Sequence, residues 1–330
     1  MKLLILGGTE FVGRAATEEA LARGWDVTVF HRGNHAPPPG VTALHGDRLD
    51  DLSALTEAVR DGAAWDAVLD TWSGHPRAVR QAADLLADHA GRYVYVSSRS
   101  VYAVSPPDQA EDGPLVEPGD EGYAHVKRAG ELAAEAAFGA DRTVLVRAGL
   151  ILGPGENIGR LPWWLNRVAR GGPVLAPGPY DLPLQYIDAR DMAVWMLDAV
   201  EAGLAGPYHL VSPQGHTTMG ELLESCVRTI GSTTAELRWV EPELILSHGV
   251  EPWLHLPVWV PPGEVHDMVH RVDVSKALAT GLSCRPVADT VADTWAWLNT
   301  LGGVAPQRSD RPVVGLDPEI EAKVLAAQGG

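Results

Sequence analysis

The stretch Lys2-Leu-Leu-Ile-Leu-Gly-Gly-Thr-Glu-Phe-Val-Gly13 decides the fold of this chain. An apolar, strand-like run leads directly into a glycine-rich turn, and a helical pattern follows the turn. Glycines allow such a turn to close and let backbone N–H groups approach a pyrophosphate at the start of a helix. The stretch therefore predicts the first strand, turn and helix of a dinucleotide-binding domain. An ordinary glycine-rich turn is the alternative.

The first half of the chain continues this alternation of short apolar runs and longer helical patterns. Such an order is typical of a parallel sheet covered by helices. The pattern predicts helices at residues 12–23, 52–60, 75–89 and 122–138. It predicts strands at Leu3–Leu6, Asp26–Phe30, Thr42–Leu44, Ala67–Leu69, Tyr93–Ser97 and Thr143–Arg147.

The amino-acid composition of the sequence changes after about residue 153. Pro and Gly become frequent, and eight of the eleven tryptophans lie between Trp163 and Trp297. A strand at Tyr208–Val211 and helices near 218–230, 287–300 and 317–327 can still be recognised. We therefore expect an α/β protein with a Rossmann-type doubly wound parallel sheet and a smaller C-terminal substrate-binding lobe. The expected nucleotide-binding domain covers residues 1–155 and is rejoined by about 183–215. The expected lobe and tail cover 156–182 and 216–330.

Composition limits the classes of partner and compartment. The 26 basic and 43 acidic residues give a net charge of −17, which argues against nucleic acid or an anionic membrane as a partner. Cys226 and Cys284 lack a metal-type spacing, and His266 and His270 have no evident third ligand, so no metal is expected. The presence of only these two cysteines favours a reduced, cytoplasmic setting. No signal peptide or membrane span is expected, because the first strand begins right after Met1 and no apolar run is long enough to span a bilayer.

The end of the second predicted strand bears on the choice of cofactor. An acidic residue there would accept hydrogen bonds from the adenosine ribose and would repel a 2′-phosphate. This chain has His31-Arg32 instead, which places a cation where the extra phosphate of NADP would lie. The sequence therefore favours NADP over NAD, although a solvated loop arginine is an alternative. After the third strand, Asp47 is a candidate to accept a hydrogen bond from the adenine amine, with an ordinary turn as the alternative.

Tyr123 and Lys127 are four residues apart and so share one face of a predicted helix. A nearby ammonium favours the phenolate, so this pairing makes a phenol usable as an acid or base near neutral pH. Ser98 lies 25 residues before the tyrosine, at the end of a predicted strand. On its own it is one of many serines in such positions.

In this order, the motifs resemble the extended short-chain dehydrogenase/reductase superfamily, in its NAD-dependent epimerase/dehydratase branch. The middle glycine of the usual loop is replaced by Glu10, which resembles an atypical subgroup. The resemblance covers roughly residues 1–300 and is carried by Gly7–Gly13, Tyr93–Tyr102, Tyr123 with Lys127, Arg147–Gly155 and Gln185–Asp191.

The resemblance implies a catalytic set of Ser98, Tyr123 and Lys127. In it, Tyr123 is the acid/base, Ser98 is the active-site hydroxyl, and Lys127 binds the nicotinamide ribose while lowering the tyrosine pKa. The residues predicted to contact the cofactor are Gly7, Thr9, Glu10, Phe11, Val12, Gly13, His31, Arg32, Asp47, Arg48 and Lys127.

Three reactions share this scaffold: carbonyl reduction or its reverse, epimerisation, and sugar dehydration. Dehydratases resemble one another in an Asp-Glu pair directly after the active-site hydroxyl, where this chain has Arg99 and Ser100. Nucleotide-sugar epimerases place arginines at two positions that read Leu184 and Pro261–Glu264 here. Arg160, Arg167 or Arg271 could substitute for these arginines.

We therefore expect an NADP-dependent oxidoreductase that moves a hydride to or from a carbonyl or hydroxyl of a small-molecule substrate, such as a secondary metabolite. The alternatives are a sugar epimerase that retains NAD, and a non-catalytic nucleotide-sensing or RNA-binding relative. The oligomeric state stays open at this point, with a homodimer as one candidate. The tryptophans of the second lobe are individually more typical of a core, but Trp163, Trp164, Trp253 and Trp259 lie in segments that look irregular and exposed. The predicted substrate contacts are Trp72, Arg99, Trp163, Trp164 and Tyr186.

Overall fold

The computed structural model describes residues 1–328 and divides the chain into two compact units. The first unit comprises Met1–Gly149, Ala189–Val211 and Asp273–Ser283. The second comprises Leu150–Asp188, Ser212–Val272 and Cys284–Gly330, of which the last two residues lie outside the described part.

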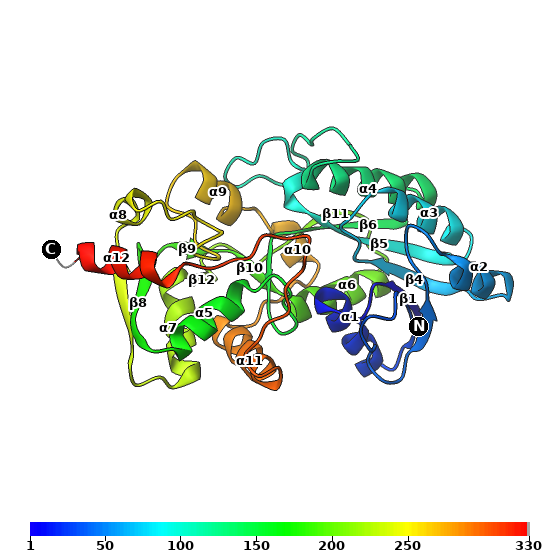
Figure 1. Cartoon of the computed structure of the whole chain (residues 1–330). Helices are drawn as coiled ribbons and strands as arrows, with labels where there is room; N and C mark the ends of the chain where they lie inside the picture. The colour runs from blue at the N-terminus through cyan, green and yellow to red at the C-terminus, as the bar shows by residue number, and fades with distance from the viewer. Residues whose placement is uncertain (329–330) are drawn as a thin grey trace. The chain divides into compact units, whose positions relative to one another are not determined.

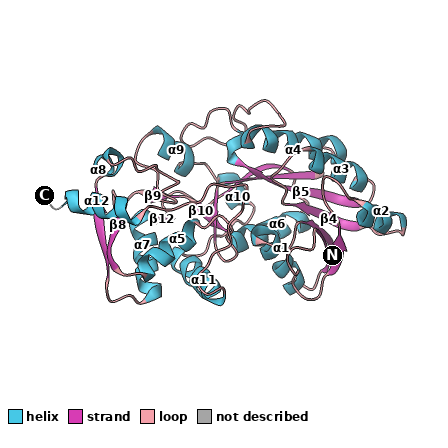
Figure 2. Ribbon diagram, in the orientation of Figure 1, coloured by secondary structure: helices cyan, strands magenta, loops and turns pink. Residues whose placement is uncertain are grey.

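A seven-stranded parallel sheet forms the centre of the first unit (Figures 1 and 2). Its strands are β1 (Lys2–Leu6), β2 (Asp26–His31), β3 (Thr42–His45), β4 (Trp65–Asp70), β5 (Ala90–Ser98), β6 (Thr143–Ala148) and β11 (Gly206–Leu210). They are ordered β11-β6-β5-β4-β1-β2-β3, and every neighbouring pair is parallel. The six strands predicted in the first half each lie inside an observed strand, and the doubly wound α/β fold is confirmed.

Helices cover both faces of this sheet. They are α1 (Phe11–Ala22), α2 (Ser53–Arg60), α3 (Arg77–Leu86), α4 (Tyr123–Phe138), α6 (Ala189–Glu201) and α10 (Ser275–Ala279), with a single 3₁₀ turn at Arg99–Val101. The α3 and α4 helices lie side by side on one face, and α1 and α6 pack together on the other (Figure 1). Because both faces are covered, the central strands are apolar throughout: Leu3–Leu6 and Ala67–Leu69 are at most 1% exposed.

The register of the sheet brings several strand ends to one edge. Leu6 at the end of β1 pairs with Phe30 on one side and Asp70 on the other, and Asp70 pairs with Tyr95 of β5. The turn after β1 and the residues that follow β2, β4 and β5 therefore meet at the carboxyl edge of the sheet. In open α/β sheets, ligands bind outside this edge.

The domain boundaries differ from those expected from the sequence. Residues 150–155 belong to the second unit, and the first unit is rejoined by Ala189–Val211 rather than by about 183–215. Residues 273–283, which the sequence placed in the C-terminal lobe, belong to the first unit. The Lys276 ammonium donates to the Pro207 carbonyl at 2.6 Å and lies 4.1 Å from the centre of the Tyr208 ring. Trp195 of α6 donates its indole N–H to Thr280. These contacts attach residues 273–283 to β11 and α6. No local pattern in the sequence predicts them.

The second unit combines short paired strands with helices. Its strands are β7 (Leu150–Leu152), β8 (Gly172–Pro177), β9 (Pro183–Leu184), β10 (Tyr186–Asp188), β12 (Thr217–Thr218) and β13 (Ala235–Val240). They pair as β13 with β8 and β10 with β7, both parallel, and as β12 with β9, antiparallel. Its helices are α5 (Arg160–Ala169), α7 (Met219–Ile230), α8 (Pro242–Ser247), α9 (Glu264–His270), α11 (Val287–Thr300) and α12 (Pro318–Gln328).

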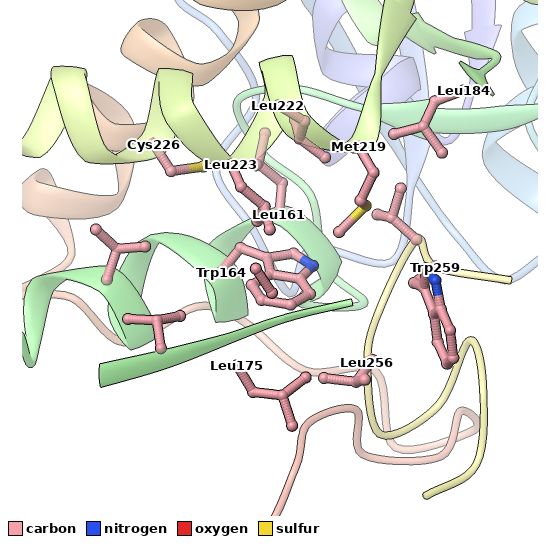
Figure 3. Packing of buried hydrophobic residues seen from close by; sticks show 14 of the residues in the cluster. Leu161, Trp164, Leu175, Leu184, Met219, Leu222, Leu223, Cys226, Leu256 and Trp259 are labelled. Carbon is pink, nitrogen blue, oxygen red and sulfur yellow. The ribbon is translucent and has the colours of Figure 1, made fainter. Parts of the chain in front are cut away.

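Two tryptophans lie in the hydrophobic core of the second unit (Figure 3). Trp164 and Trp259 are fully buried, and their indole N–H groups donate to the carbonyls of Pro257 and Gly178. Figure 3 shows Trp164 among Leu161, Leu223 and Leu175. Trp164 lies on α5 rather than in an irregular segment, because Pro162 falls in the first turn of that helix, where proline is tolerated. The expectation that these two tryptophans are exposed and face a ligand is therefore wrong.

The last helix is held to this core by a buried ion pair. Glu321 of α12 accepts from Arg167 Nε with both oxygens, at 2.8 and 2.7 Å, and also from the backbone N–H of Leu175. Arg167 also donates to the carbonyls of Gly171 and Pro173. The predicted last helix therefore covers the second unit and does not trail from it.

Candidate nucleotide-binding and catalytic site

The turn after β1 is shaped so that only glycine fits its key positions. Gly7 has φ = 104°, in the region that favours glycine, and a Cβ at Gly7 would lie 2.6 Å from Thr71 Oγ1. A Cβ at Gly13 would overlap the Gly7 carbonyl oxygen. Thr17 of α1 donates its hydroxyl to the Gly8 and Gly13 carbonyls. The sequence Gly7–Gly13 thus closes a tight turn against the first residues of α1, and the close approach of its backbone requires glycine at positions 7 and 13.

The predicted contacts within this turn differ in exposure. Val12 is buried, Thr9 N–H donates to the Gly7 carbonyl, and Phe11 begins α1 with a positive φ of 38°. The Glu10 side chain is 42% exposed and lies 3.5 Å from His35 Nε2. As the N-cap residue, Glu10 makes no side-chain capping bond to α1 within the part of the chain that is described. Its carboxylate therefore leaves the N–H groups of the first turn to a ligand.

The end of β2 holds a buried histidine next to an exposed arginine. His31 is 7% exposed, and its Nδ1 accepts from the Gly33 N–H at 3.2 Å. His31 Nε2 is buried, and no atom of residues 1–328 forms a hydrogen bond with it. The ring lies 4.7 Å from that of His45, and burial together with His45 lowers the pKa of His31. Arg32 follows with an exposed side chain.

Asp47 and Arg48 have structural roles after β3. Asp47 forms a backbone bridge with Asp51, and its side chain accepts from the Leu49 N–H. Arg48 is 6% exposed and makes a two-bond ion pair with Asp70 at the end of β4, with distances of 2.9 and 2.8 Å. Because Arg48 is directed into the interior and engaged there, its geometry argues against the predicted cofactor contact.

The three predicted catalytic residues come from β5 and α4. Ser98 ends β5, and its hydroxyl accepts from the Ser100 N–H at 3.1 Å, so it also caps the 3₁₀ turn that follows. Tyr123 is the first residue of α4 and is 40% exposed. Lys127, one turn later, is 2% exposed. The packing of α4 against β5 and the 3₁₀ turn brings these residues to the same edge of the sheet as the glycine turn.

Two backbone carbonyls, one after β4 and one in β5, hold the Lys127 side chain in place. Its ammonium donates to the carbonyls of Trp72 and Val96, both at 2.6 Å, and lies 4.9 Å from the centre of the Tyr95 ring. Tyr95 can approach because Gly130 faces it on α4, where a Cβ would overlap the Tyr95 hydroxyl. A buried ammonium with fixed acceptors is a fixed positive charge on the same helix as Tyr123, one turn later.

The predicted substrate contacts have different environments. Trp72 and Arg99 belong to the first unit and are partly buried, and Trp72 donates its indole N–H to the His75 carbonyl. Burial lowers the pKa of Arg99 to about 10. In the second unit, Trp164 and Tyr186 are at most 2% exposed and belong to the hydrophobic core. The prediction that these two residues contact the substrate is therefore wrong. Trp163 packs edge-on against Trp164 and is only partly buried.

The residues proposed to replace the missing arginines of the epimerases are engaged elsewhere. Arg167 is buried against Glu321, and Arg271 lies 3.4 Å from Asp267. Arg160 stacks on the Trp253 ring at 5.1 Å. Each guanidinium therefore already has a contact that competes with a diphosphate.

Two residues that support the site were missed in the sequence, Asp70 and Tyr95. Asp70 is fully buried and accepts from Arg48, from Tyr93 and from the Trp72 N–H. The one available signal was an acidic residue at the end of an otherwise apolar strand, which suggests a buried charge with a partner. The partner, Arg48, is 22 residues away, and spacing alone could not identify it.

A parallel sheet of this order, with a glycine turn after its first strand, defines a dinucleotide-binding Rossmann domain. Ser98 ends β5 at the carboxyl edge of this sheet, and Lys127 of α4 donates to the Trp72 carbonyl there. The chain belongs to the NAD dependent epimerase/dehydratase family, whose model matches residues 3–211. A 2-alkyl-3-oxoalkanoate reductase of Stenotrophomonas maltophilia (strain K279a) is 29% identical over 255 residues, which cover 70% of this chain and 76% of that protein.

Solved structures show the same fold at low sequence identity. The Bordetella bronchiseptica enzyme WbmH, in complex with NAD+, has a TM-score of 0.67 and 20% identity, covering 91% of this chain and 99% of its own. The UDP-glucose 4-epimerase of Thermus thermophilus, in complex with NAD, has a TM-score of 0.64 and 19% identity, with the same coverage of 91% and 99%. Across residues 1–328, no helix is long and apolar enough to cross a membrane.

Proposed function

We propose that this protein is an NADP-dependent reductase that converts a carbonyl group of a small molecule to an alcohol. The observation that carries the proposal is the placement of Lys127. Its ammonium is fixed by the carbonyls of Trp72 and Val96, one helical turn from Tyr123 and at the strand end occupied by Ser98. This is the arrangement needed to make a phenol deliver and recover a proton near neutral pH.

In the reducing direction, the Ser98 hydroxyl donates a hydrogen bond to the substrate carbonyl oxygen, and the Tyr123 hydroxyl donates its proton to that oxygen. The bound nicotinamide supplies the hydride. Lys127 stabilises the resulting phenolate through its fixed positive charge, and it holds the ribose hydroxyls of the cofactor. The two residues after Ser98 are Arg99 and Ser100, which provide no carboxylate for dehydration.

NADP is proposed as the cofactor because cationic and hydrogen-bonding groups gather at the end of β2. Arg32 is exposed there, and the buried His31 Nε2 has no partner within the described residues. No carboxylate occupies positions 31–33, where one would repel a 2′-phosphate. The glycine turn, with Gly7 at φ = 104° and no space for a Cβ at Gly13, supports a pyrophosphate between β1 and α1.

A 3-oxo acid is proposed as the substrate class, because the reductase to which the chain is similar acts on a 2-alkyl-3-oxoalkanoate according to its name. Arg99 is the group that would pair with the substrate carboxylate, since it directly follows Ser98 and its side chain is partly buried. Losing a charge-assisted hydrogen bond in Arg99→Gln should lower kcat/KM for a 3-oxo acid roughly 10- to 100-fold. The same change should leave kcat/KM for the ketone of equal chain length without a carboxylate nearly unaltered. Equal losses for both compounds would contradict the role of Arg99.

Calorimetric titration of cofactor-free protein with NADPH and NADH tests the cofactor assignment. Wild-type protein should bind NADPH more tightly, and Arg32→Ala should weaken NADPH binding while leaving NADH binding unchanged. Arg60→Ala is a matched control, because Arg60 lies in the same unit with a 72% exposed side chain and pairs only loosely with Asp61. A preference for NADH would contradict the assignment to NADP. NAD that cannot be removed without unfolding would instead favour the epimerase alternative.

The proposal includes a cytoplasmic homodimer without a nucleic-acid or membrane partner. The net charge of −17 disfavours phosphate backbones and anionic lipids. Leu132 of α4 is 38% exposed, so α4 offers apolar surface to a second copy. Light scattering on the purified protein should give the mass of two chains, and retention on RNA at low salt would contradict the exclusion of nucleic acid.

A further inference from the structure

The ion pair between Arg48 and Asp70 lies in the interior of the first unit and takes no direct part in the proposed chemistry. Asp70 accepts four hydrogen bonds: two from Arg48, one from the Tyr93 hydroxyl at 2.5 Å, and one from the Trp72 N–H at 2.9 Å. Arg48 also donates to the Ala78 carbonyl at 3.1 Å. A buried ion pair is weak evidence for stability, because removing both charges from water is costly.

The contacts of Trp72 connect this pair with the catalytic lysine. The Trp72 N–H is fixed by Asp70, and the Trp72 carbonyl accepts from the Lys127 ammonium at 2.6 Å. Arg48 lies 5.4 Å from the centre of the Trp72 ring. The residue that orients Lys127 is therefore held at its backbone N–H by a carboxylate and at its side chain by a guanidinium, both of them buried.

We propose that Asp70, held by Arg48 and Tyr93, is a positioning residue that fixes the Trp72 carbonyl and thereby holds Lys127 against Tyr123. This inference rests on the proposed function, in which Lys127 supports the Tyr123 phenolate. Without the Asp70 contacts, the chain after β4 can shift, and the Lys127 ammonium loses one of its two fixed acceptors. The ammonium then spends less time near Tyr123, and the phenolate is less stabilised.

A purely structural role for the ion pair predicts a different result. In that case, breaking the pair lowers the stability of the first unit but leaves the function of Lys127 in the folded protein unchanged. The affinity for NADPH, whose ribose Lys127 holds in the proposed function, therefore separates the two roles, and its measurement needs no substrate. It is measured by calorimetric titration of each folded protein and of the same protein carrying Lys127→Met, in which loss of the Asp70 contacts should have no further effect.

Two variants disturb the Asp70 contacts without changing the net charge. Tyr93→Phe removes only the hydroxyl that donates to Asp70. Arg48→Met with Asp70→Leu removes both charges together, which avoids an uncompensated buried charge. Tyr208→Phe, in β11 of the same sheet, and Arg167→Met with Glu321→Leu, a buried ion pair of the second unit, are the matched controls.

Loss of one fixed acceptor of Lys127 should weaken NADPH binding roughly 3-fold in Tyr93→Phe and roughly 10-fold in the double variant. Both controls should bind NADPH as wild type does. Unchanged affinity in folded Tyr93→Phe and in the double variant, or equal losses in the Lys127→Met background, would overturn the inference, and Tyr93→Phe alone decides if the double variant does not fold. A loss of affinity that depends on Lys127, together with full turnover by Tyr123→Phe, would keep the positioning role and reject the proposed function.

Discussion

Glu156 should make the stability of the second unit depend on pH. This side chain is fully buried, and its carboxyl group accepts from the N–H groups of Arg160 and Leu161 at 2.7 and 3.1 Å, at the start of α5. Burial raises its pKa from 4.5 to about 7, against the opposing effect of the nearby Arg160 charge and the two N–H donors. The folded protein therefore binds this proton more tightly than the unfolded chain does.

The direction and size of the effect follow from this difference. Below pH 4.5 the carboxyl group is protonated in both states and has no effect on stability. Between pH 4.5 and about 7 the unfolded chain loses the proton first, so stability falls as pH rises, and the loss is complete above that range. The gap in pKa corresponds to about 3 kcal/mol of unfolding free energy.

Glu156→Gln removes the titration and keeps an acceptor for the helix N–H groups. Urea unfolding is followed by tryptophan fluorescence at intervals from pH 4 to 8. As pH rises over this range, the free energy of unfolding of the variant should increase by about 3 kcal/mol relative to that of wild type. Glu243→Gln is the control, because Glu243 is an exposed residue of α8 in the same unit. A difference between wild type and Glu156→Gln that stays constant over this range would refute the reasoning.

Two further changes test the turn and the second core. Gly13→Ala should weaken NADPH binding by about 1–3 kcal/mol in a calorimetric titration while the protein stays folded, because the added methyl group overlaps the Gly7 carbonyl and displaces the turn; unchanged affinity would show that the turn does not hold the pyrophosphate. Trp164→Ala should lower the free energy of unfolding by about 3–5 kcal/mol without changing NADPH affinity, since the side chain is fully buried in the second core. Trp297→Ala changes a partly buried residue and should lower the free energy of unfolding clearly less than Trp164→Ala does. Equal decreases in the two variants would contradict the assignment of Trp164 to the core.

The central sheet could be predicted from the sequence because local and tertiary preferences agree there. Runs such as Leu3–Leu6 and Ala67–Leu69 are apolar at every position, and the structure buries them on both faces. The glycine turn was equally clear, since its position directly after a strand is enough to identify it. The strand and helix that carry Ser98, Tyr123 and Lys127 were predicted for the same reason.

The second unit was less predictable because its contacts join distant segments. Residues 172–177, rich in Gly and Pro, form strand β8 only because β13 pairs with them. A tryptophan in a Pro-containing segment gives no sign of whether it is buried, so Trp164 and Trp259 were placed wrongly. Arg48 was assigned to the cofactor because it follows a strand, whereas its position depends on Asp70, a partner that only the folded sheet brings near.

The most direct test of the proposed chemistry is the turnover of Tyr123→Phe with NADPH and a 3-oxo acid. Removing the proton donor should lower kcat at least about 100-fold and leave the affinity for NADPH within a factor of about 2 of wild type. Tyr180→Phe, which also alters a half-exposed tyrosine (43% exposed), should keep wild-type activity. A Tyr123→Phe protein that retains more than about a tenth of wild-type kcat would contradict the account.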